Sequence, residues 1–325
     1  MSTASTEIQA LTAAQFTTPE KFLKFCHNDG KPHGGIINGQ SMRGSMNATF
    51  ETIDPGSMET LATICEMGQD EVDAAVAAGQ QAFRGNGANG WRDLPVEEKC
   101  ALVMKLVELC ERDRDALLAC EIRDGGKVSE LAEGDFAQIR ATAEYFCDVA
   151  KRIPLGDGSK MQVADNIQGY TYREPWGVVA GIIPWNYPIV LTSWFIFPAL
   201  LSGNCVLIKP AEDTPLSALY IGKLAEEAGF PPGVINVLPG RGELTGQFMA
   251  EHPGIRYISF TGSPGVGQHI LRTCDRHGTR MKREMGGNGA AIVLEDADPQ
   301  AVARMIGRHT NQHFGQTCCT IHRVF

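Results

Sequence analysis

Two adjacent cysteines, Cys318 and Cys319, are the clearest candidates for chemistry in this chain. A turn of small and polar residues, Gly315-Gln316-Thr317, leads directly into them, which is the local setting of a thiol nucleophile. A free thiol is only a few per cent ionised at neutral pH, so a nucleophilic cysteine needs a helix N-terminus, a cation or a base beside it. For the other eight cysteines we expect the ordinary role of buried, unreactive side chains.

Three loops, 184–188 (PWNYP), 209–212 (KPAE) and 260–267 (FTGSPGVG), follow short apolar segments and carry polar groups. In the last of them, glycines would let backbone N–H groups approach a phosphate near a helix N-terminus, although a glycine turn is also an ordinary structural feature. A Walker A loop would need Lys-Ser/Thr after Gly267, and Gln268-His269 follow instead, so that interpretation fails. The segment 240–246 (GRGELTG) resembles a dinucleotide fingerprint with one residue too many.

The elements that must position these loops alternate between strand and helix from residue 176 onward. We expect strands over 177–183, 205–209, 235–238, 257–261 and 290–294, with helices between them. This pattern predicts an α/β fold with a doubly wound parallel sheet, whose ligand crevice lies at the carboxyl ends of the strands.

Upstream of that region, glycine and short apolar alternations over 34–65 predict an N-terminal antiparallel meander. Apolar residues recurring at three and four predict amphipathic helices over 71–84, 96–111, 112–123 and 133–152. Residues 159–174 alternate around Ala164-Asp165-Asn166 and predict a β-hairpin. An isolated hairpin is marginally stable, so it packs on something else, for example another subunit, or is an ordinary surface hairpin.

Composition excludes several classes of protein. The 325 residues are 43% hydrophobic, which is enough for a large core, and the formal charge of −9 without a Lys/Arg block argues against nucleic acid as a partner. Ten scattered cysteines without a CxxC pair indicate a reducing compartment. Residues 1–16 lack the pattern of a signal or transit peptide, and polar residues interrupt 189–206, so we expect a cytoplasmic protein without a membrane span.

Six motifs together resemble the NAD(P)-dependent aldehyde dehydrogenase superfamily, in order and approximate spacing. They are PWNYP, LIKPAE, LPGRGELTG, FTGSPGVG, Glu284-Met285-Gly286-Gly287 and Gly315-Gln316-Thr317-Cys318. The resemblance runs from about residue 36 to the last residue and implies an N-terminal extension (1–33), an NAD-binding domain (34–158 and 175–285), an oligomerisation hairpin (159–174) and the beginning of an α/β catalytic domain (286–325). It also implies a C-terminally truncated chain, which lacks the family's later Glu-x-Phe segment.

The resemblance implies that an aldehyde is oxidised to a carboxylic acid through a thiohemiacetal and a thioester. Cys318 would be the nucleophile, with Cys319 as the less favoured alternative. The side-chain amide of Asn186 and the backbone N–H of Cys318 would form the oxyanion hole, and Glu284 would be the general base. Without the resemblance, Asn186 has an alternative role as a turn residue and Glu284 as a solvated surface carboxylate.

The implied cofactor is NAD, with NADP possible. Lys209 and Glu212 would lie at the adenosine ribose, where a carboxylate accepts hydrogen bonds from free hydroxyls and repels a 2′-phosphate. Trp185 and Phe260 could be either pocket walls or core residues. The full set of expected cofactor-binding residues is Ile182, Ile183, Pro184, Trp185, Lys209, Ala211, Glu212, Gly242, Gly246, Phe260, Gly262, Ser263, Gly267, Glu284, Met285 and Gly286.

Two alternatives stay open. The chain departs from the family's pattern at Asn288, where Lys is common. The first alternative is a truncated, catalytically inactive structural or binding protein that keeps the fold without turnover. A zinc site is a weaker alternative, with the possible ligands His309, His313, Cys318, Cys319 and His322; we expect no metal. The expected partners are a small-molecule aldehyde and, in an intact relative, further copies of the chain, while the identity of the aldehyde is not determined by the sequence.

Overall fold

A seven-stranded sheet forms the centre of the molecule, in the order β11-β10-β7-β8-β9-β1-β2. The computed structural model describes residues 18–85, 89–153, 156 and 158–325. Neighbouring strands from β11 to β9 run parallel, whereas β1 is antiparallel to β9 and β2 to β1. The strands are β1 (Gly35–Ile37), β2 (Gln40–Met42), β7 (Val178–Ile182), β8 (Cys205–Lys209), β9 (Ile235–Val237), β10 (Tyr257–Gly262) and β11 (Arg280–Met285).

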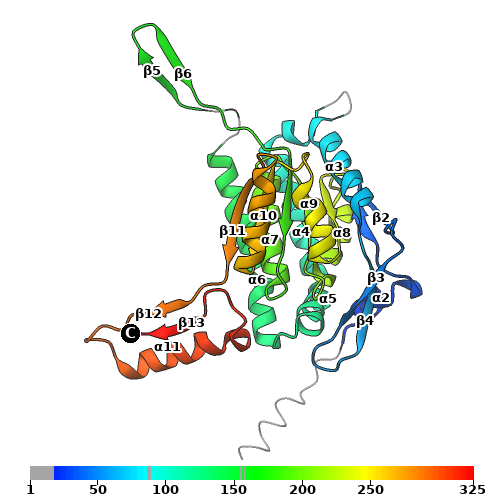
Figure 1. Ribbon diagram of the computed structural model, residues 1–325, viewed down its shortest axis with the longest axis vertical. Coiled ribbons are helices and arrows are strands. Elements are labelled where there is room, and N and C mark those ends of the chain that lie inside the picture. The colour runs from blue at the N-terminus through cyan, green and yellow to red at the C-terminus, as the bar shows by residue number, and fades with distance from the viewer. Residues whose placement is uncertain (1–17, 86–88, 154–155, 157) are drawn as a thin grey trace, which may run out of the picture.

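Helices cover both faces of this sheet (Figure 1). On one face lie α7 (Pro188–Leu201) and α8 (Leu216–Ala228), with α4 (Val96–Arg112), α5 (Arg114–Ala119) and α6 (Ser129–Arg152) packed behind them. On the other face lie α3 (Gln69–Arg84), α9 (Gln247–Glu251) and α10 (Pro264–Asp275). The predicted doubly wound α/β fold is confirmed.

The two central strands are apolar because both of their faces are buried. All residues of β7 and β8 are buried, and their side chains alternate between two cores, with Val178 and Ala180 on the α3 side and Val179 on the α7 side. Gly181 lies in β7 where a Cβ atom would come within 2.4 Å of the Phe195 ring. Glycine at this position therefore lets α7 pack closely on the strand that precedes the candidate site.

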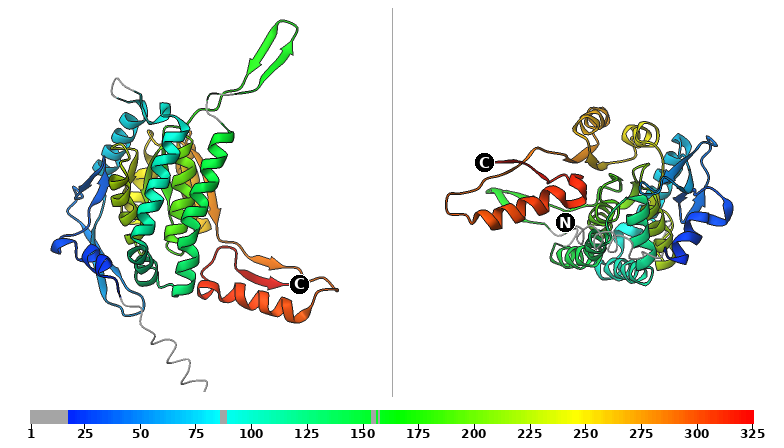
Figure 2. Two further views of the ribbon diagram at one scale, coloured as in Figure 1. Left: turned by 180° about the vertical axis from the view of Figure 1, so that it is seen from behind. Right: turned by 90° about the horizontal axis from the view of Figure 1, so that it is seen from below.

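Three smaller units extend from the central body (Figure 2). The hairpin β3 (Thr49–Ile53) and β4 (Thr60–Cys65) lies near α2 (Glu20–His27). The hairpin β5 (Lys160–Ala164) and β6 (Ile167–Tyr170) projects far from the body, as predicted for 159–174. The third unit pairs β12 (Gly289–Ala291) with β13 (Ile321–Val324) and carries α11 (Pro299–Asn311). No helix among the described residues is long and apolar enough to cross a membrane.

Three expectations about the elements were wrong in detail. Residues 34–65 form two separate hairpins instead of one meander, because β1 and β2 join the main sheet while β3 pairs only with β4. The edge strand β11 was missed, since four of its six side chains are charged and it carries no apolar run. The strand expected over 290–294 ends at Ala291, and Ile292 and Leu294 are exposed.

Candidate active site

The loops after β8 and β9 meet at the carboxyl edge of the sheet. The ammonium of Lys209 lies 2.9 Å from Glu212 Oε2, and the backbone N–H of Gly242 donates to Glu212 Oε1 at 3.3 Å. Burial lowers the pKa of Lys209 more than Glu212 raises it. For Glu212, burial alone would raise the pKa, but the attraction and hydrogen bond of Lys209, together with hydrogen bonds from the backbone N–H groups of Glu212 and Gly242, outweigh burial and lower the pKa. The structure thus brings together three of the expected cofactor-binding residues, and two of them, Lys209 and Glu212, are the pair expected at the ribose.

A buried carboxylate that the sequence did not reveal holds the loop after β9. Glu66 is fully buried and accepts a hydrogen bond from the backbone N–H of Arg241 at 2.6 Å, while the Arg241 guanidinium lies 3.5 Å away. The Thr245 hydroxyl donates to the backbone carbonyl of Met67 at 2.6 Å. These contacts fix the segment that contains Gly242 and Gly246. An isolated glutamate just after a strand carries no sequence signal for this role.

The glycine turn after β10 begins helix α10. The Ser263 side chain accepts a hydrogen bond from the Val266 backbone N–H at 3.4 Å, as an N-cap residue does. A Cβ atom at Gly267 would lie 3.0 Å from the Phe260 ring and 2.8 Å from the Met285 sulfur. Phe260 is buried beneath the turn and belongs to the core, one of the two roles left open for it. Gly267 is therefore required by packing as much as by any ligand.

The loop after β7 faces the candidate nucleophile. Ile182 and Ile183 are buried, and the Ile183 backbone N–H donates to the Lys209 carbonyl at 2.9 Å. The Asn186 Nδ2 atom donates to the backbone carbonyl of Gln316 at 2.8 Å. This contact places the Asn186 amide beside the residue that lies two positions before Cys318.

The remaining expected cofactor residues lie around these loops. Trp185 is 41% exposed, so of its two possible roles a pocket wall fits better than a core position, and it lines a cavity with Gln316. Pro184 is partly buried and Ala211 is buried. A Cβ atom at Gly286 would meet open space. The surroundings of these residues leave room for a ligand at Trp185 and Gly286.

The nucleophile loop has an unusual backbone. His313, Phe314 and Gly315 have φ angles of 48°, 56° and 79°, so two non-glycine residues adopt the left-handed conformation in succession. Cys318 and Cys319 follow and are both exposed. Partial burial and the neighbouring Cys319 thiol raise the pKa of Cys318, while nearby backbone N–H groups lower it to a lesser extent. The surroundings of Cys318 therefore favour the thiol over the thiolate.

Glu284 lies on the edge strand β11, opposite Thr261 of β10. Its carboxylate is 3.3 Å from the Lys282 ammonium, and the two side chains are 59% and 57% exposed. The described contacts of Glu284 are thus those of a surface ion pair. The structure joins Asn186 to the nucleophile loop through Gln316, but it shows no contact between Glu284 and that loop within the described residues.

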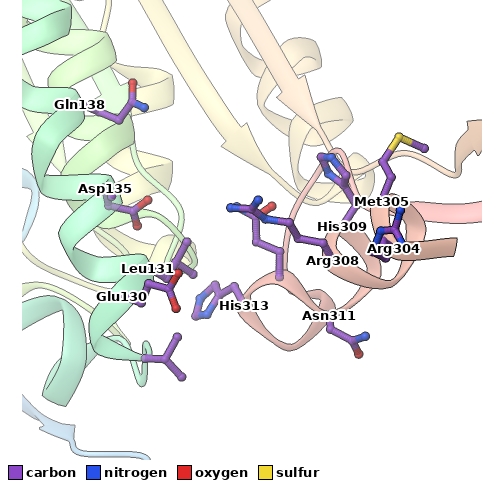
Figure 3. Close-up of a pocket in the computed structure, with 13 residues that line it drawn as sticks. Glu130, Leu131, Asp135, Gln138, Arg304, Met305, Arg308, His309, Asn311 and His313 are labelled. Carbon is purple, nitrogen blue, oxygen red and sulfur yellow. The ribbon is translucent and has the colours of Figure 1, made fainter. Parts of the chain in front are cut away.

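A cavity of about 840 Å³ separates α6 from α11 and the turn that follows it (Figure 3). Arg308 and His313 point across it toward α6, where Glu130, Leu131 and Asp135 lie. His309 also lines this cavity. Within the described ranges, no cluster of three His, Cys, Asp or Glu side chains is placed to hold a metal ion.

Comparison with known proteins identifies the family. The sequence model of the aldehyde dehydrogenase family matches residues 42–325. The chain belongs to this family. It is 38% identical over 297 residues to an NAD(P)+ aldehyde dehydrogenase of Saccharomyces cerevisiae, which covers 91% of this chain and 58% of the yeast protein. It is 38% identical over 278 residues to human aldehyde dehydrogenase 1A1, covering 85% of this chain and 54% of the human protein.

A solved structure shows the same arrangement. The NAD+ complex of an aldehyde dehydrogenase from Bacillus cereus superimposes with a TM-score of 0.88 at 34% identity, covering 95% of this chain and 61% of the bacterial one. This member of the aldehyde dehydrogenase family therefore spans about three fifths of the length of the relatives that it matches. The resemblance on which the expected site residues rest is confirmed at the level of the family and the fold.

Proposed function

We propose that this aldehyde dehydrogenase family member oxidises an aldehyde to a carboxylic acid with NAD+, through a covalent intermediate on Cys318. The observation that carries the proposal is the hydrogen bond from Asn186 Nδ2 to the Gln316 carbonyl. It brings an amide donor from the end of one parallel strand to the loop that contains an exposed thiol. A donor beside a nucleophile is what attack on a carbonyl requires.

The first step joins the aldehyde to the protein. The Cys318 thiol gives its proton to solvent water, and its sulfur forms a bond to the carbonyl carbon while the carbonyl oxygen becomes an alkoxide. A primary amide has two N–H donors, and Gln316 takes one of those on Asn186. The second N–H and the backbone N–H of Cys318 can stabilise the alkoxide, and losing such a donor costs about 3 kcal/mol in comparable sites.

The second step leaves an acyl group on Cys318, which water must remove. NAD+, when bound, accepts the hydride that leaves the alkoxide carbon. Glu284 would then take a proton from the water that attacks the thioester, so that the carboxylic acid is released and the Cys318 thiol is restored. In the present structure Glu284 pairs with Lys282, so we infer that it must turn away from that surface partner to act.

The strand ends fit the proposed dinucleotide. Lys209 and Glu212 are already held at the end of β8, and their oxygen and nitrogen atoms could bind ribose hydroxyls. The Glu212 carboxylate would repel a 2′-phosphate, which favours NAD+ over NADP+. A Cβ atom at Gly242, Gly265 or Gly286 would meet nothing within 4 Å, so backbone at these places can approach a ligand closely. NAD+ is also the ligand of the Bacillus cereus relative.

We propose that the β5–β6 hairpin joins copies of the chain. Its apolar side chains Met161, Val163, Ile167 and Tyr170 are all at least 50% exposed. Side chains of this kind are normally covered by another surface.

We propose a reducing, cytoplasmic location for the protein. All ten cysteines are free, which fits such a location.

Peptide mapping of Cys318 with and without NAD+ tests the catalytic proposal. We expect NAD+ to change the rate at which iodoacetamide labels Cys318, and Glu212→Ala to weaken that effect. The matched control is Glu251→Ala, which removes an exposed carboxylate from α9. Labelling that NAD+ does not alter would contradict the proposal. An altered labelling rate without acid formation from any aldehyde would favour the alternative of a binding protein that keeps the fold without turnover.

A further inference from the structure

A buried charge cluster lies beneath the loop that carries Asn186. The Lys127 ammonium is 2.6 Å from Glu121 Oε2 and 2.5 Å from Asp135 Oδ2, and all three side chains are at least nine-tenths buried. Burial alone would lower the pKa of Lys127, but the two carboxylates outweigh it and raise the pKa. The same ammonium lies 4.5 Å from the centre of the Tyr187 ring, within the range of a cation–π contact. The cluster therefore contacts one face of the Tyr187 ring and helps to fix its position.

The cluster also holds the beginning of α7. The second oxygen of Glu121 accepts a hydrogen bond from the backbone N–H of Ile189 at 3.1 Å. The first N–H groups of a helix have no partner inside the helix, and a negative charge is favourable at that end. Glu121 thus fixes the first turn of α7 while Lys127 lies against the ring of Tyr187, the residue just before the helix.

Two consecutive residues before α7 contact two consecutive residues before Cys318. The Tyr187 hydroxyl and the Thr317 hydroxyl lie 2.9 Å apart, and Asn186 donates to the carbonyl of Gln316. The ring of His313 packs edge-on against Tyr187, with 5.5 Å between ring centres. The oxyanion donor and the nucleophile lie far apart in sequence, so their relative position depends on these few contacts.

We propose that the hydroxyl pair of Tyr187 and Thr317 positions the Cys318 thiol against the Asn186 amide, with the buried Lys127 cluster holding Tyr187 in place. Both are positioning residues, because neither needs to touch the substrate. The inference rests on the proposed function of Cys318 as nucleophile and adds the device that aligns it. Thr317 directly precedes Cys318, so holding the Thr317 side chain restrains the backbone from which the Cys318 side chain extends.

Two reagents distinguish a loss of alignment between the Cys318 thiol and the Asn186 amide from a general disturbance of the structure around Cys318. With 4-nitrophenyl acetate, the Cys318 sulfur bonds to the carbonyl carbon, an alkoxide forms, and the bond to 4-nitrophenolate breaks to leave an acetyl thioester. With iodoacetamide, the sulfur displaces iodide directly and no alkoxide forms. Only the first reaction needs the Asn186 amide and the thiol to be aligned. A merely structural role would change both rates or neither.

We expect Tyr187→Phe to lower the acylation rate constant at Cys318 about threefold to tenfold, the usual effect of losing one hydrogen bond. Thr317→Val should lower it by at least as much, because the Thr317 hydroxyl also donates to the Gln312 carbonyl at 3.4 Å. The double variant should lose no more than Thr317→Val alone, because that variant already removes the contact that the two hydroxyls share. Iodoacetamide labelling of Cys318 should stay within about twofold of the original rate. Tyr145→Phe is the matched control, since it removes a hydroxyl from a tyrosine of α6 that is 60% exposed.

The outcomes are distinguishable. If the unaltered chain is not acylated at Cys318 by the ester, the proposed function fails, and this inference fails with it. If the unaltered chain is acylated but the Tyr187 and Thr317 variants keep the full rate, show additive losses, or lose acylation and alkylation equally, only the positioning role is overturned. Peptide fragmentation assigns each modification to Cys318 or to Cys319.

Discussion

Replacing Glu284 by glutamine decides whether this carboxylate is a general base or a surface charge. Its ion pair with Lys282 spans 3.3 Å between side chains that are both more than half exposed. Such pairs contribute between about 0 and 1 kcal/mol, so their loss changes a rate at most about fivefold. Removing a general base costs about 100-fold to 10,000-fold. The two roles therefore predict effects that differ by more than a factor of ten.

The assay uses excess 4-nitrophenyl acetate, where the burst of nitrophenolate reports acylation of Cys318 and the steady rate reports hydrolysis of the thioester. We expect Glu284→Gln to keep the burst and to lower the steady rate by at least about 100-fold. Lys282→Met, which removes only the ion pair, should change the steady rate by less than about fivefold. If both variants lower the steady rate by the same small factor, Glu284 is not the base.

Three further predictions concern the oxyanion donor, the packing of β7 and the response to acid. Asn186→Ala should lower the burst rate about 100-fold to 1,000-fold, whereas Asn311→Ala, which removes an amide bonded to a carbonyl on α11, should leave it unchanged. Gly181→Ala should lower the free energy of unfolding by about 1–3 kcal/mol in urea, because its Cβ meets a buried aromatic ring. Gly134→Ala, with open space around its Cβ, should be neutral or stabilising. Burial lowers the pKa of His33 to about 4, so the folded state binds this proton less readily than the unfolded state. Stability that is present above about pH 6.5 should be lost as the pH falls toward 4, and His33→Gln should reduce that loss in unfolding curves.

The central fold could be predicted because its strands are buried on both faces. The uninterrupted apolar run 205–208 has one stable location, inside a covered parallel sheet, and the structure places β8 there over the predicted range 205–209. The edge strand β11 follows no such rule. Its partner β10 supplies hydrogen bonds on one side only, and its charged side chains remain in solvent. Backbone pairing with β10 and the packing of Met281 and Met285 on the core hold it, and two separated apolar residues among four charged ones do not form a strand pattern that the sequence reveals.

The candidate site divides in the same way. Residues in recognisable motifs, such as Asn186 and Glu212, lie at strand ends, where the fold class leads one to expect them. Residues that act through distant partners were not predictable. Glu66 holds the loop after β9 from the end of β4, and Lys127 reaches beneath Tyr187 from a different part of the chain. Neither has a neighbour in sequence that reveals its partner, so only the three-dimensional structure identifies them.

The charged groups around Cys318 determine how readily its thiol ionises. Lys127, the buried cation that lies against the Tyr187 ring, is already paired with two carboxylates, Glu121 and Asp135. Partial burial and the Cys319 thiol raise the pKa of Cys318. Without ligands, we therefore expect the rate of Cys318 alkylation by iodoacetamide to keep rising beyond about pH 8.5, the ordinary thiol pKa. Cys319→Ser should increase the rate at neutral pH, because it removes one cause of the raised pKa. A plateau already reached below pH 7 would show that the protein alone ionises this thiol, and the activating group would then have to be sought among its own side chains.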